Sequence, residues 1–556
     1  MTHCSGWLNL PLPASVVVEK LGDKVVARSK DGMIAEDVDA SAVIQSAINS
    51  LTPGRTWKEK VVLKGDFIVT KQAGKSYAIG LPSYTILEIL GKIRLADNQS
   101  CDVIANIDQS GGNHHIEIIG GIIDGNKTNQ TAGSGIKLKA SPTDWSGPYC
   151  YRNVIKNVHV YNCKAYGFRF EACNDLMITN CYSGVVGGPG SGYDGFYIDS
   201  CHEVFLVGCH SIANGRDGYR VASTLASGVW ENQLANCGSE NNSAWAYHFL
   251  GGNIMACTLV GCTCDDCPSG GVYVEGGEEI TISGNSLARG TYGVRVAASR
   301  VNVVGNSIRE VKQGVCVEAS GVNVVGNRIH GKKEADEYGV YLASGVNNCL
   351  VAGNLITYIS TDAGDQAGIL LYGNNHYNTI IANKIFDVGR FGIRLAPGGV
   401  SSYNNIVNNH IDTCVTGIGI YGSHIYNHIS KNMIRNPVYY GISLSAGADY
   451  NQVVDNVLYG GTTIYLSDTA GVNNVIKRNF GFITENSGAA IITAGNTYVN
   501  VAHGLNIIPD INRIKLTPKD NLGGRNWWVS DVGATTFRIN ISSADTVDHA
   551  FGWSYE

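Results

Sequence analysis

The chain has 556 residues; 69 are Gly and 12 are Pro, 44% of the chain is hydrophobic, and only 16% is charged. This hydrophobic content excludes a disordered tail, and Gly without a strict period excludes collagen. The formal net charge of −6 gives no overall basic field that would favour nucleic acid as a partner. Length alone allows several ordinary domains or one long repetitive fold, and the composition favours the repetitive fold.

The N-terminal sequence lacks the basic start and apolar stretch of a secretory signal, and no apolar run in the chain is long enough to span a membrane. We therefore expect no membrane insertion. We also expect an extracellular or virion-associated protein that reaches its location without a classical signal peptide.

The first regular element predicted is a helix over residues 39–51. Asp39 is a good N-cap, and Val43, Ile44, Ala47 and Ile48 lie on one face at helical spacing. Residues 60–70 then read as two short strands. A helix before the first strands is expected to cover the open end of a repetitive fold.

From residue 135 a short phrase recurs, in which Gly is followed by alternating apolar and variable residues, as in Gly167-Phe-Arg-Phe-Glu and Gly271-Val-Tyr-Val-Glu. Successive phrases lie 21 to 32 residues apart, which is too short for strand-helix-strand units. Strands of period two with Gly at the turns and no helices between them predict an all-β fold, a right-handed parallel β-helix.

A second signature ends each coil with a small residue, which is Cys in the early coils and Asn in the later ones. The Cys residues include Cys181, Cys209, Cys237 and Cys262, and the Asn positions begin at Asn285. In a stack of coils these residues predict an internal ladder of amides and buried thiols. No metal site is predicted from them, and no cofactor is expected, with Ca²⁺ left open.

The helix followed by Val-Val-Leu-Lys-Gly-Asp-Phe-Ile-Val, the phrase Ile116-Glu-Ile-Ile-Gly-Gly-Ile-Ile-Asp-Gly125 and the Gly/Asn coils resemble the pectate-lyase-like β-helix superfamily. That superfamily includes polygalacturonases, alginate epimerases and lyases, and phage tailspike depolymerases. The resemblance covers residues 35 to 485 and implies a polysaccharide as partner. The Asp-Pro-His of alginate lyases and epimerases and the Gly-His-Gly of polygalacturonases are absent.

After residue 485 the pattern changes to alternating strands with Gly and Asn turns, which predicts a small antiparallel β-sandwich. It resembles the small β-domains that end many viral tail proteins, where they trimerise or bind a receptor; a simple end cap is the alternative. The predicted domains are 1–59 with the capping helix, 60–485 with the β-helix, and 486–556 with the sandwich.

The third and fifth positions of the phrase should face outward, because the apolar positions between them face the core. In the early coils these positions carry acids, bases and aromatic residues together, whereas the later coils are mostly neutral there. Asp194 and Asp217 each precede the Gly of consecutive coils, so we expect them to stack as a groove-lining acid-base pair. The catalytic candidates are Arg169, Glu171, Asp194, Tyr197, Asp199, Asp217, Arg220 and His248, and the substrate-binding candidates are Lys137, Lys139, Tyr247, Tyr273, Glu275 and Arg295.

Paired carboxylates suit glycoside hydrolysis, whereas a base beside cations suits a lyase that acts on an acidic polysaccharide. The sequence thus predicts a polysaccharide-degrading enzyme of virion-tailspike or secreted type, lyase or glycoside hydrolase. The alternatives are a non-catalytic glycan-binding adhesin or tail fibre, and, for single residues, plain cross-strand ion pairs such as Arg169 with Glu171. Apolar residues expected on the outside of the later coils (Tyr341, Leu370, Tyr372 and Tyr421) predict a homotrimer.

Overall fold

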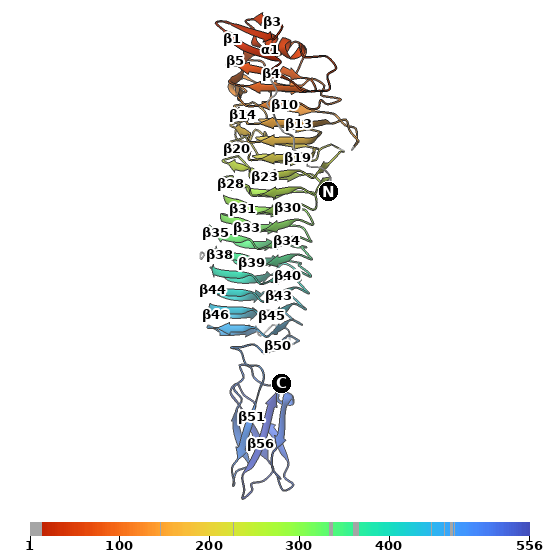
Figure 1. The fold of residues 1–556 in the computed structure, drawn as a ribbon. Helices are drawn as coiled ribbons and strands as arrows, with labels where there is room; N and C mark the ends of the chain where they lie inside the picture. The colour runs from red at the N-terminus through yellow and green to blue at the C-terminus, as the bar shows by residue number, and fades with distance from the viewer. Residues whose placement is uncertain are drawn as a thin grey trace. The chain divides into compact units, whose positions relative to one another are not determined.

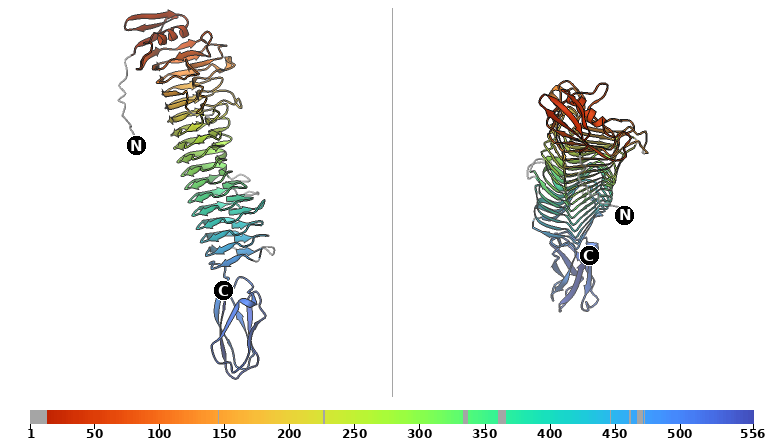
Figure 2. Two further views of the ribbon diagram at one scale, coloured as in Figure 1. Left: turned by 90° about the vertical axis from the view of Figure 1, so that its right-hand side faces the viewer. Right: turned by 45° about the horizontal axis from the view of Figure 1, so that its top comes forward.

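The computed structural model describes residues 14–144, 146–225, 227–332, 337–359, 366–445, 447–460, 462–466, 471 and 473–556. The N-terminal stretch that we expect not to be a signal peptide lies outside these residues. The chain forms two compact units, one up to Lys332 and one from Lys333 onward. This division falls inside the segment 60–485 and both units contain parallel coils (Figures 1 and 2).

The predicted capping helix is confirmed as α1 (Ala40–Asn49), the one α-helix among the described residues. The Asp39 side chain accepts a hydrogen bond from the Ser41 amide at 2.9 Å, and Val43, Ile44, Ala47 and Ile48 are buried. Before the helix, β1 (Val16–Leu21), β2 (Lys24–Ser29) and β3 (Gly32–Asp37) form an antiparallel meander that the sequence reading missed. Strand β1 also pairs in parallel with the first coil strand.

Three parallel ladders build the coils of the first unit, and Figure 1 shows the strands of successive coils lying side by side. The first ladder contains β4 (Glu59–Lys64), β7 (Thr85–Ile89), β10 (Glu117–Ile119), β13 (Cys150–Lys156), β16 (Cys173–Thr179), β19 (His202–Val207), β23 (Gln233–Ala235), β27 (Thr258–Val260), β30 (Thr281–Ser283), β32 (Asn302–Val304) and β34 (Asn323–Val325). Short strands β22 (Val229–Trp230) and β26 (Ile254–Met255) pair beside it.

The second ladder contains β5 (Phe67–Val69), β8 (Lys92–Leu95), β11 (Ile122–Asp124), β14 (His159–Tyr161), β17 (Tyr182–Gly184), β20 (His210–Ile212), β24 (Gly238–Glu240), β28 (Thr263–Asp265) and β35 (Arg328–Gly331). The third contains β6 (Tyr77–Leu81), β9 (Asp102–Asn106), β12 (Ile136–Lys139), β15 (Phe168–Glu171), β18 (Phe196–Asp199), β21 (Tyr219–Ala222), β25 (Trp245–Leu250) and β29 (Gly270–Val274). Long strands β31 (Ser286–Val296) and β33 (Ser307–Val317) run through both ladders.

In the second unit one ladder contains β37 (Leu350–Ala352), β40 (Thr379–Ile381), β43 (Asn405–Val407), β45 (His428–Ser430), β47 (Gln452–Val454) and β50 (Val475–Lys477). The other strands are β36 (Tyr338–Leu342), β38 (Leu355–Ile359), β39 (Ala367–Tyr372), β41 (Lys384–Val388), β42 (Phe391–Ala396), β44 (His410–Ile420), β46 (Met433–Leu444), β48 (Val457–Tyr459) and β49 (Thr462–Leu466). All of these pairings are parallel, so the predicted β-helix is confirmed.

The C-terminal part is a sandwich of two antiparallel sheets, as predicted. One sheet holds β51 (Asn486–Ile492), β56 (His549–Tyr555) and β53 (Ile514–Pro518); the other holds β52 (Tyr498–Ala502), β55 (Thr536–Ile541) and β54 (Trp527–Ser530). Phe537 and Ile539 from one sheet pack with Phe551 and Trp553 from the other in a shared core.

The inside of the coils holds the predicted ladder. Cys262 accepts from the Cys237 amide at 3.4 Å and donates its own amide to Asn285 Oδ1 at 2.8 Å, so the thiol and amide sections are continuous. The expected apolar outer face of the later coils is partly wrong, because Leu370 is buried with Phe391, and Tyr341 and Tyr421 pack against them. Tyr372 remains exposed.

Candidate functional site

The outward residues of the third ladder form a continuous column across seven coils of the first unit. Parallel pairing places each third-position residue beside the next, in the order Lys137, Arg169, Tyr197, Arg220, His248, Tyr273 and Arg295. Glu171 and Asp199 pair in the same way at the fifth position, as the sequence predicted. We call the third-position set the charged column.

Asp194 and Asp217 come together beneath this column, in the turns that precede β18 and β21. The Asp217 amide donates to Asp194 Oδ1 at 3.1 Å. Both side chains are buried, with exposed fractions of 0% and 1%, so the prediction that they line an open groove is wrong. The sequence foresaw their proximity, but loops and side chains from neighbouring coils cover them.

Asp194 is held by an arginine that the sequence reading missed. Arg216 donates from Nε to Asp194 Oδ1 at 2.7 Å and from Nη2 to Oδ2 at 2.5 Å. Burial raises the pKa of Asp194 to about 6, and the charge of Asp217 adds to the rise while Arg216 opposes it. In the sequence, Arg216 directly precedes Asp217, and this position could have indicated a cation beside the two carboxylates.

Asp217 joins the buried pair to the surface. Its Oδ2 lies 3.1 Å from Arg220 Nη1 and 3.0 Å from His248 Nδ1, and its Oδ1 accepts from the Trp245 amide at 3.0 Å. These contacts leave each oxygen of Asp217 with a partner. Asp217 is thus placed to orient His248 and Arg220.

His248 bridges a buried and an exposed carboxylate. Its Nε2 lies 3.0 Å from Oε2 of Glu275, whose side chain is 43% exposed. A neutral imidazole donates from one nitrogen only, whereas an imidazolium or a protonated carboxylic acid lets both contacts be hydrogen bonds. His248 thus links the buried Asp217 to the outward Glu275 through its two ring nitrogens.

Aromatic rings border this exposed end. His248 stacks on Tyr273 with ring centroids 5.0 Å apart, and the Arg295 guanidinium lies 4.9 Å from the Tyr273 ring centroid. Trp245 packs with its ring centroid 5.0 Å from that of Tyr273. We call Asp194, Arg216, Asp217, Arg220, His248 and Glu275 the Asp217 cluster; it combines a carboxylate–imidazole–carboxylate chain, two arginines and an adjoining aromatic surface.

The other predicted carboxylates are occupied by neighbours. Glu171 pairs with Arg169 and with Lys139, whose Nζ lies 3.1 Å away. Burial raises the pKa of Glu171, but Arg169 and Lys139 outweigh it and hold the pKa below its ordinary value. Asp199 accepts from the Tyr197 hydroxyl at 3.0 Å and from the Thr224 amide at 3.0 Å. The ion-pair interpretation therefore describes Arg169 and Glu171.

Tyr247 is not a surface residue, so its predicted contact with sugar is wrong. Its side chain is fully buried, stacks on Tyr219 at 5.0 Å and donates to the Cys237 carbonyl at 2.7 Å. It occupies the inward second position of its phrase, where Phe196 and Tyr219 stack at 4.8 Å. Tyr166 was missed instead; its ring lies 4.8 Å from Tyr197 and 5.2 Å from the Arg169 guanidinium.

Two cavities bordered by described residues lie elsewhere. A hollow of about 270 Å³ is bordered by residues of β20, β24 and β28, and a groove of about 570 Å³ lies in the second unit. Neither is lined by the Asp217 cluster, whose outer end faces an open strand surface. Among the described residues no group of three or more His, Cys, Asp or Glu is arranged to hold a metal ion, and no helix is long and apolar enough to cross a membrane.

Solved structures resemble this chain over most of its length. A mutant tailspike protein of E. coli bacteriophage HK620 in complex with a hexasaccharide has 13% identity and a TM-score of 0.41, over 94% of this chain and 90% of that chain. The A-module of mannuronan C-5 epimerase AlgE4 from Azotobacter vinelandii has 16% identity and a TM-score of 0.32, over 79% of this chain and 96% of that chain. No curated protein matches the sequence.

The family comparison bears directly on the coils that carry the site. Three overlapping stretches, residues 120–287, 194–356 and 292–458, match the family model described as "Right handed beta helix region". Together they span more than half of the chain, and they include the charged column from Lys137 to Arg295. This chain therefore belongs to the right-handed β-helix family.

Proposed function

We propose that this protein binds an acidic polysaccharide along the charged column and cleaves it by β-elimination at the Asp217 cluster. The observation that carries the proposal is His248, held 3.0 Å from both the buried Asp217 and the exposed Glu275. An open strand surface suits a polymer better than a small molecule, which is usually enclosed in a pocket.

The roles follow from exposure and charge. Glu275, with His248 behind it, is the base that takes the proton on C5 of a uronate, next to the carboxylate. Arg295, which pairs with Glu318 at 3.1 Å, and Arg220, which pairs with Asp217 at 3.1 Å, supply positive charge for the carboxylate as negative charge develops on it. Tyr273 offers an aromatic surface for a sugar ring.

The elimination balances within this set. As the base takes the C5 proton, the C4–O bond breaks, its electron pair leaves on oxygen, and a double bond forms between C4 and C5. The proton held by Glu275 and His248 then returns to the leaving oxygen. Asp217, Asp194 and Arg216 do not reach the substrate in this scheme; they position His248 and Arg220.

Hydrolysis is the less supported reaction, because it needs two carboxyl groups on either side of the scissile bond. The four carboxylates predicted to be catalytic, Asp194, Asp217, Asp199 and Glu171, are all buried and paired, so none of them offers Glu275 an exposed partner. The same extensive pairing supports the second candidate function, a glycan-binding protein without turnover.

The experiment compares Glu275→Gln with Glu279→Gln, an exposed neighbour in the same coil, on a panel of acidic and neutral polysaccharides. We expect ultraviolet absorbance from the new double bond with acidic polymers, and a kcat lower by about 100-fold or more in Glu275→Gln. Glu279→Gln should retain wild-type turnover. New reducing ends without ultraviolet absorbance would indicate a hydrolase, and binding without any product would establish the glycan-binding function.

A further inference from the structure

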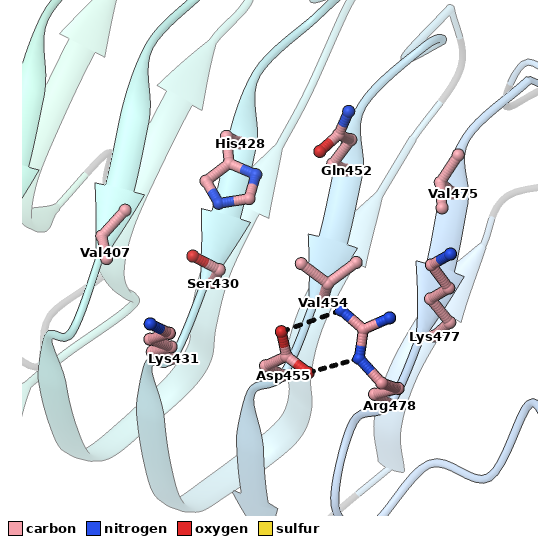
Figure 3. A pocket seen from close by; sticks show the side chains of 10 residues that line it. All are labelled: Val407, His428, Ser430, Lys431, Gln452, Val454, Asp455, Val475, Lys477 and Arg478. Atoms are coloured by element: carbon pink, nitrogen blue, oxygen red, sulfur yellow. Dashed lines mark hydrogen bonds and ion pairs between the residues drawn. The ribbon is translucent and has the colours of Figure 1, made fainter.

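The second unit carries a surface groove that is separate in sequence and in unit from the Asp217 cluster. It has a volume of about 570 Å³ and lies along β43, β45, β47 and β50 (Figure 3). Its lining consists of Val407, His428, Ser430, Lys431, Gln452, Val454, Asp455, Val475, Lys477 and Arg478.

The strand pattern explains why these side chains meet. Ile406, Ile429 and Val453 are fully buried, so their neighbours on each strand point outward. Parallel pairing then aligns Ser430 with Val454 and Val454 with Lys477. Lys431, Asp455 and Arg478 directly follow three of these strands.

The charge of the groove is positive. Arg478 donates from Nε to Asp455 Oδ1 at 2.8 Å and from Nη2 to Oδ2 at 3.1 Å, as the dashed lines in Figure 3 show. This hydrogen bonding lowers the pKa of Asp455, so the one carboxylate of the lining is ionised and neutralised by Arg478. In the part of the chain that the structure describes, neither Lys431 nor Lys477 has a carboxylate within 4.0 Å of its ammonium.

The remaining lining defines the ligand. Gln452 offers an exposed neutral amide beside these two ammonium groups, which suits a ligand rich in both hydroxyl and anionic groups; Ser430 is buried at the floor of the groove. None of the lining residues is Phe, Tyr or Trp, but the exposed rings of Tyr403, Tyr426 and Tyr450 directly precede strands β43, β45 and β47 and offer a surface on which sugar rings can pack.

We propose that this groove binds an acidic polysaccharide, with carboxylate or sulfate groups at Lys431 and Lys477 and sugar hydroxyls at Gln452. The site anchors polymer and does not depend on the proposed cleavage, because it uses different residues in a different unit. A lysine ammonium binds such anions as a point charge, so both carboxylated and sulfated polymers fit.

The test uses the full chain and measures Kd for alginate, heparin, dextran and single-stranded DNA at several salt concentrations. The test variant is Lys431→Glu/Lys477→Glu. The matched control is Lys75→Glu/Lys384→Glu, which changes the net charge equally at two exposed lysines outside the groove. Thermal unfolding of both variants is measured as a control: an unchanged Tm shows that a change in Kd reflects binding and not loss of the fold.

We expect alginate and heparin to bind the wild type and the control alike, and the test variant to bind about tenfold more weakly or worse, because two attractions become repulsions. Binding should weaken as salt is raised, and dextran should not bind. Turnover of a short acidic oligosaccharide should persist in the test variant, while Glu275→Gln should keep the groove's affinity, so the two sites fail independently.

Several outcomes would overturn the proposal. They are equal affinity in the test variant and the wild type, an equal loss in the control, equal binding of dextran, or no binding of either acidic polymer to the wild type. Tighter binding of DNA than of both acidic polymers, lost in the same variant, would assign the groove to nucleic acid instead.

Discussion

At Asp217, contacts from three coils meet on one residue: its carboxylate faces Arg220, His248 and the Trp245 amide, and its main-chain amide donates to Asp194. Arg220 lies on the same coil, Asp194 on the coil before, and Trp245 and His248 on the coil after. Removal of one partner from such a buried set leaves the others without a hydrogen-bond partner. The cluster therefore contributes to both the fold and the candidate chemistry.

Asp194 should give the protein a measurable pH dependence of stability. Its folded pKa of about 6 lies above its ordinary value of 3.8, so between these pH values the folded state binds more protons than the unfolded state. The free energy of unfolding contributed by this group is thus highest below pH 3.8 and decreases as pH rises toward about 6. Urea unfolding at several pH values should show that wild type loses stability relative to Asp194→Asn across this window. Parallel pH profiles for the two proteins would contradict this reading of Asp194.

At the scale of elements, the second unit is held by two buried asparagine ladders. One includes Asn383, Asn409 and Asn432, as the sequence predicted. The other includes Asn378, Asn404 and Asn427, which the sequence reading missed. Each amide bonds both to its neighbour and to a main-chain carbonyl, so a turn of one coil is tied to the next.

Adjacent residues allow a controlled test of this ladder. Asn404 is buried, donates to Asn427 Oδ1 at 2.9 Å and to the Asn375 carbonyl at 2.8 Å, and accepts from the Asn378 amide at 3.0 Å. Asn404→Ala should lower the free energy of unfolding by about 1–3 kcal/mol or more, because it leaves buried groups without partners. Asn405→Ala, at the exposed next position, should change it by less than about 0.5 kcal/mol in the same urea titration. Equal effects would contradict the role of the ladder.

At the scale of the whole molecule, the buried thiols lead to a prediction about their reactivity. All 15 cysteines that the structure describes are free and buried. Burial raises the pKa of Cys257 to about 12, which disfavours the reactive thiolate. In a Cys4→Ser protein, we expect no thiol to react with a soluble disulfide reagent in native buffer and all 15 of these to react in denaturant. Rapid native labelling would mean that the coils open locally.

The oligomeric state is a second prediction at this scale. Tyr377, Tyr403, Tyr426 and Tyr450 form an exposed stacked row with ring centroids 5.1 to 5.3 Å apart. Apolar surface of this kind favours association, so we expect a homotrimer joined through the later coils and the C-terminal sandwich. Light scattering should give about three times the 59.3 kDa chain mass. A mass near that of one chain would refute the trimer.

The sequence by itself determined the β-helix, the capping helix, the sandwich and one internal ladder, because each depends on short-range patterns. Alternation of apolar residues sets which side chain faces inward, and a repeat of roughly constant length stacks equal positions. The second ladder also left a signal, a Tyr residue that recurs just before it at Tyr377, Tyr403, Tyr426 and Tyr450 and is followed each time by Asn. The meander at residues 16–37 pairs across short turns and lacks such a repeat.

Only the tertiary structure decided which candidate residues are exposed. Asp194 and Asp217 lie in turns, where no alternation fixes the direction of a side chain, and Arg216, Trp245 and neighbouring coils cover them. Glu275 and Asp199 share a fifth position of the phrase, yet one is open and the other is enclosed by Thr224. The exposure of these side chains depends on loops from neighbouring coils. The residue pattern within one coil carries no information about the position of those loops.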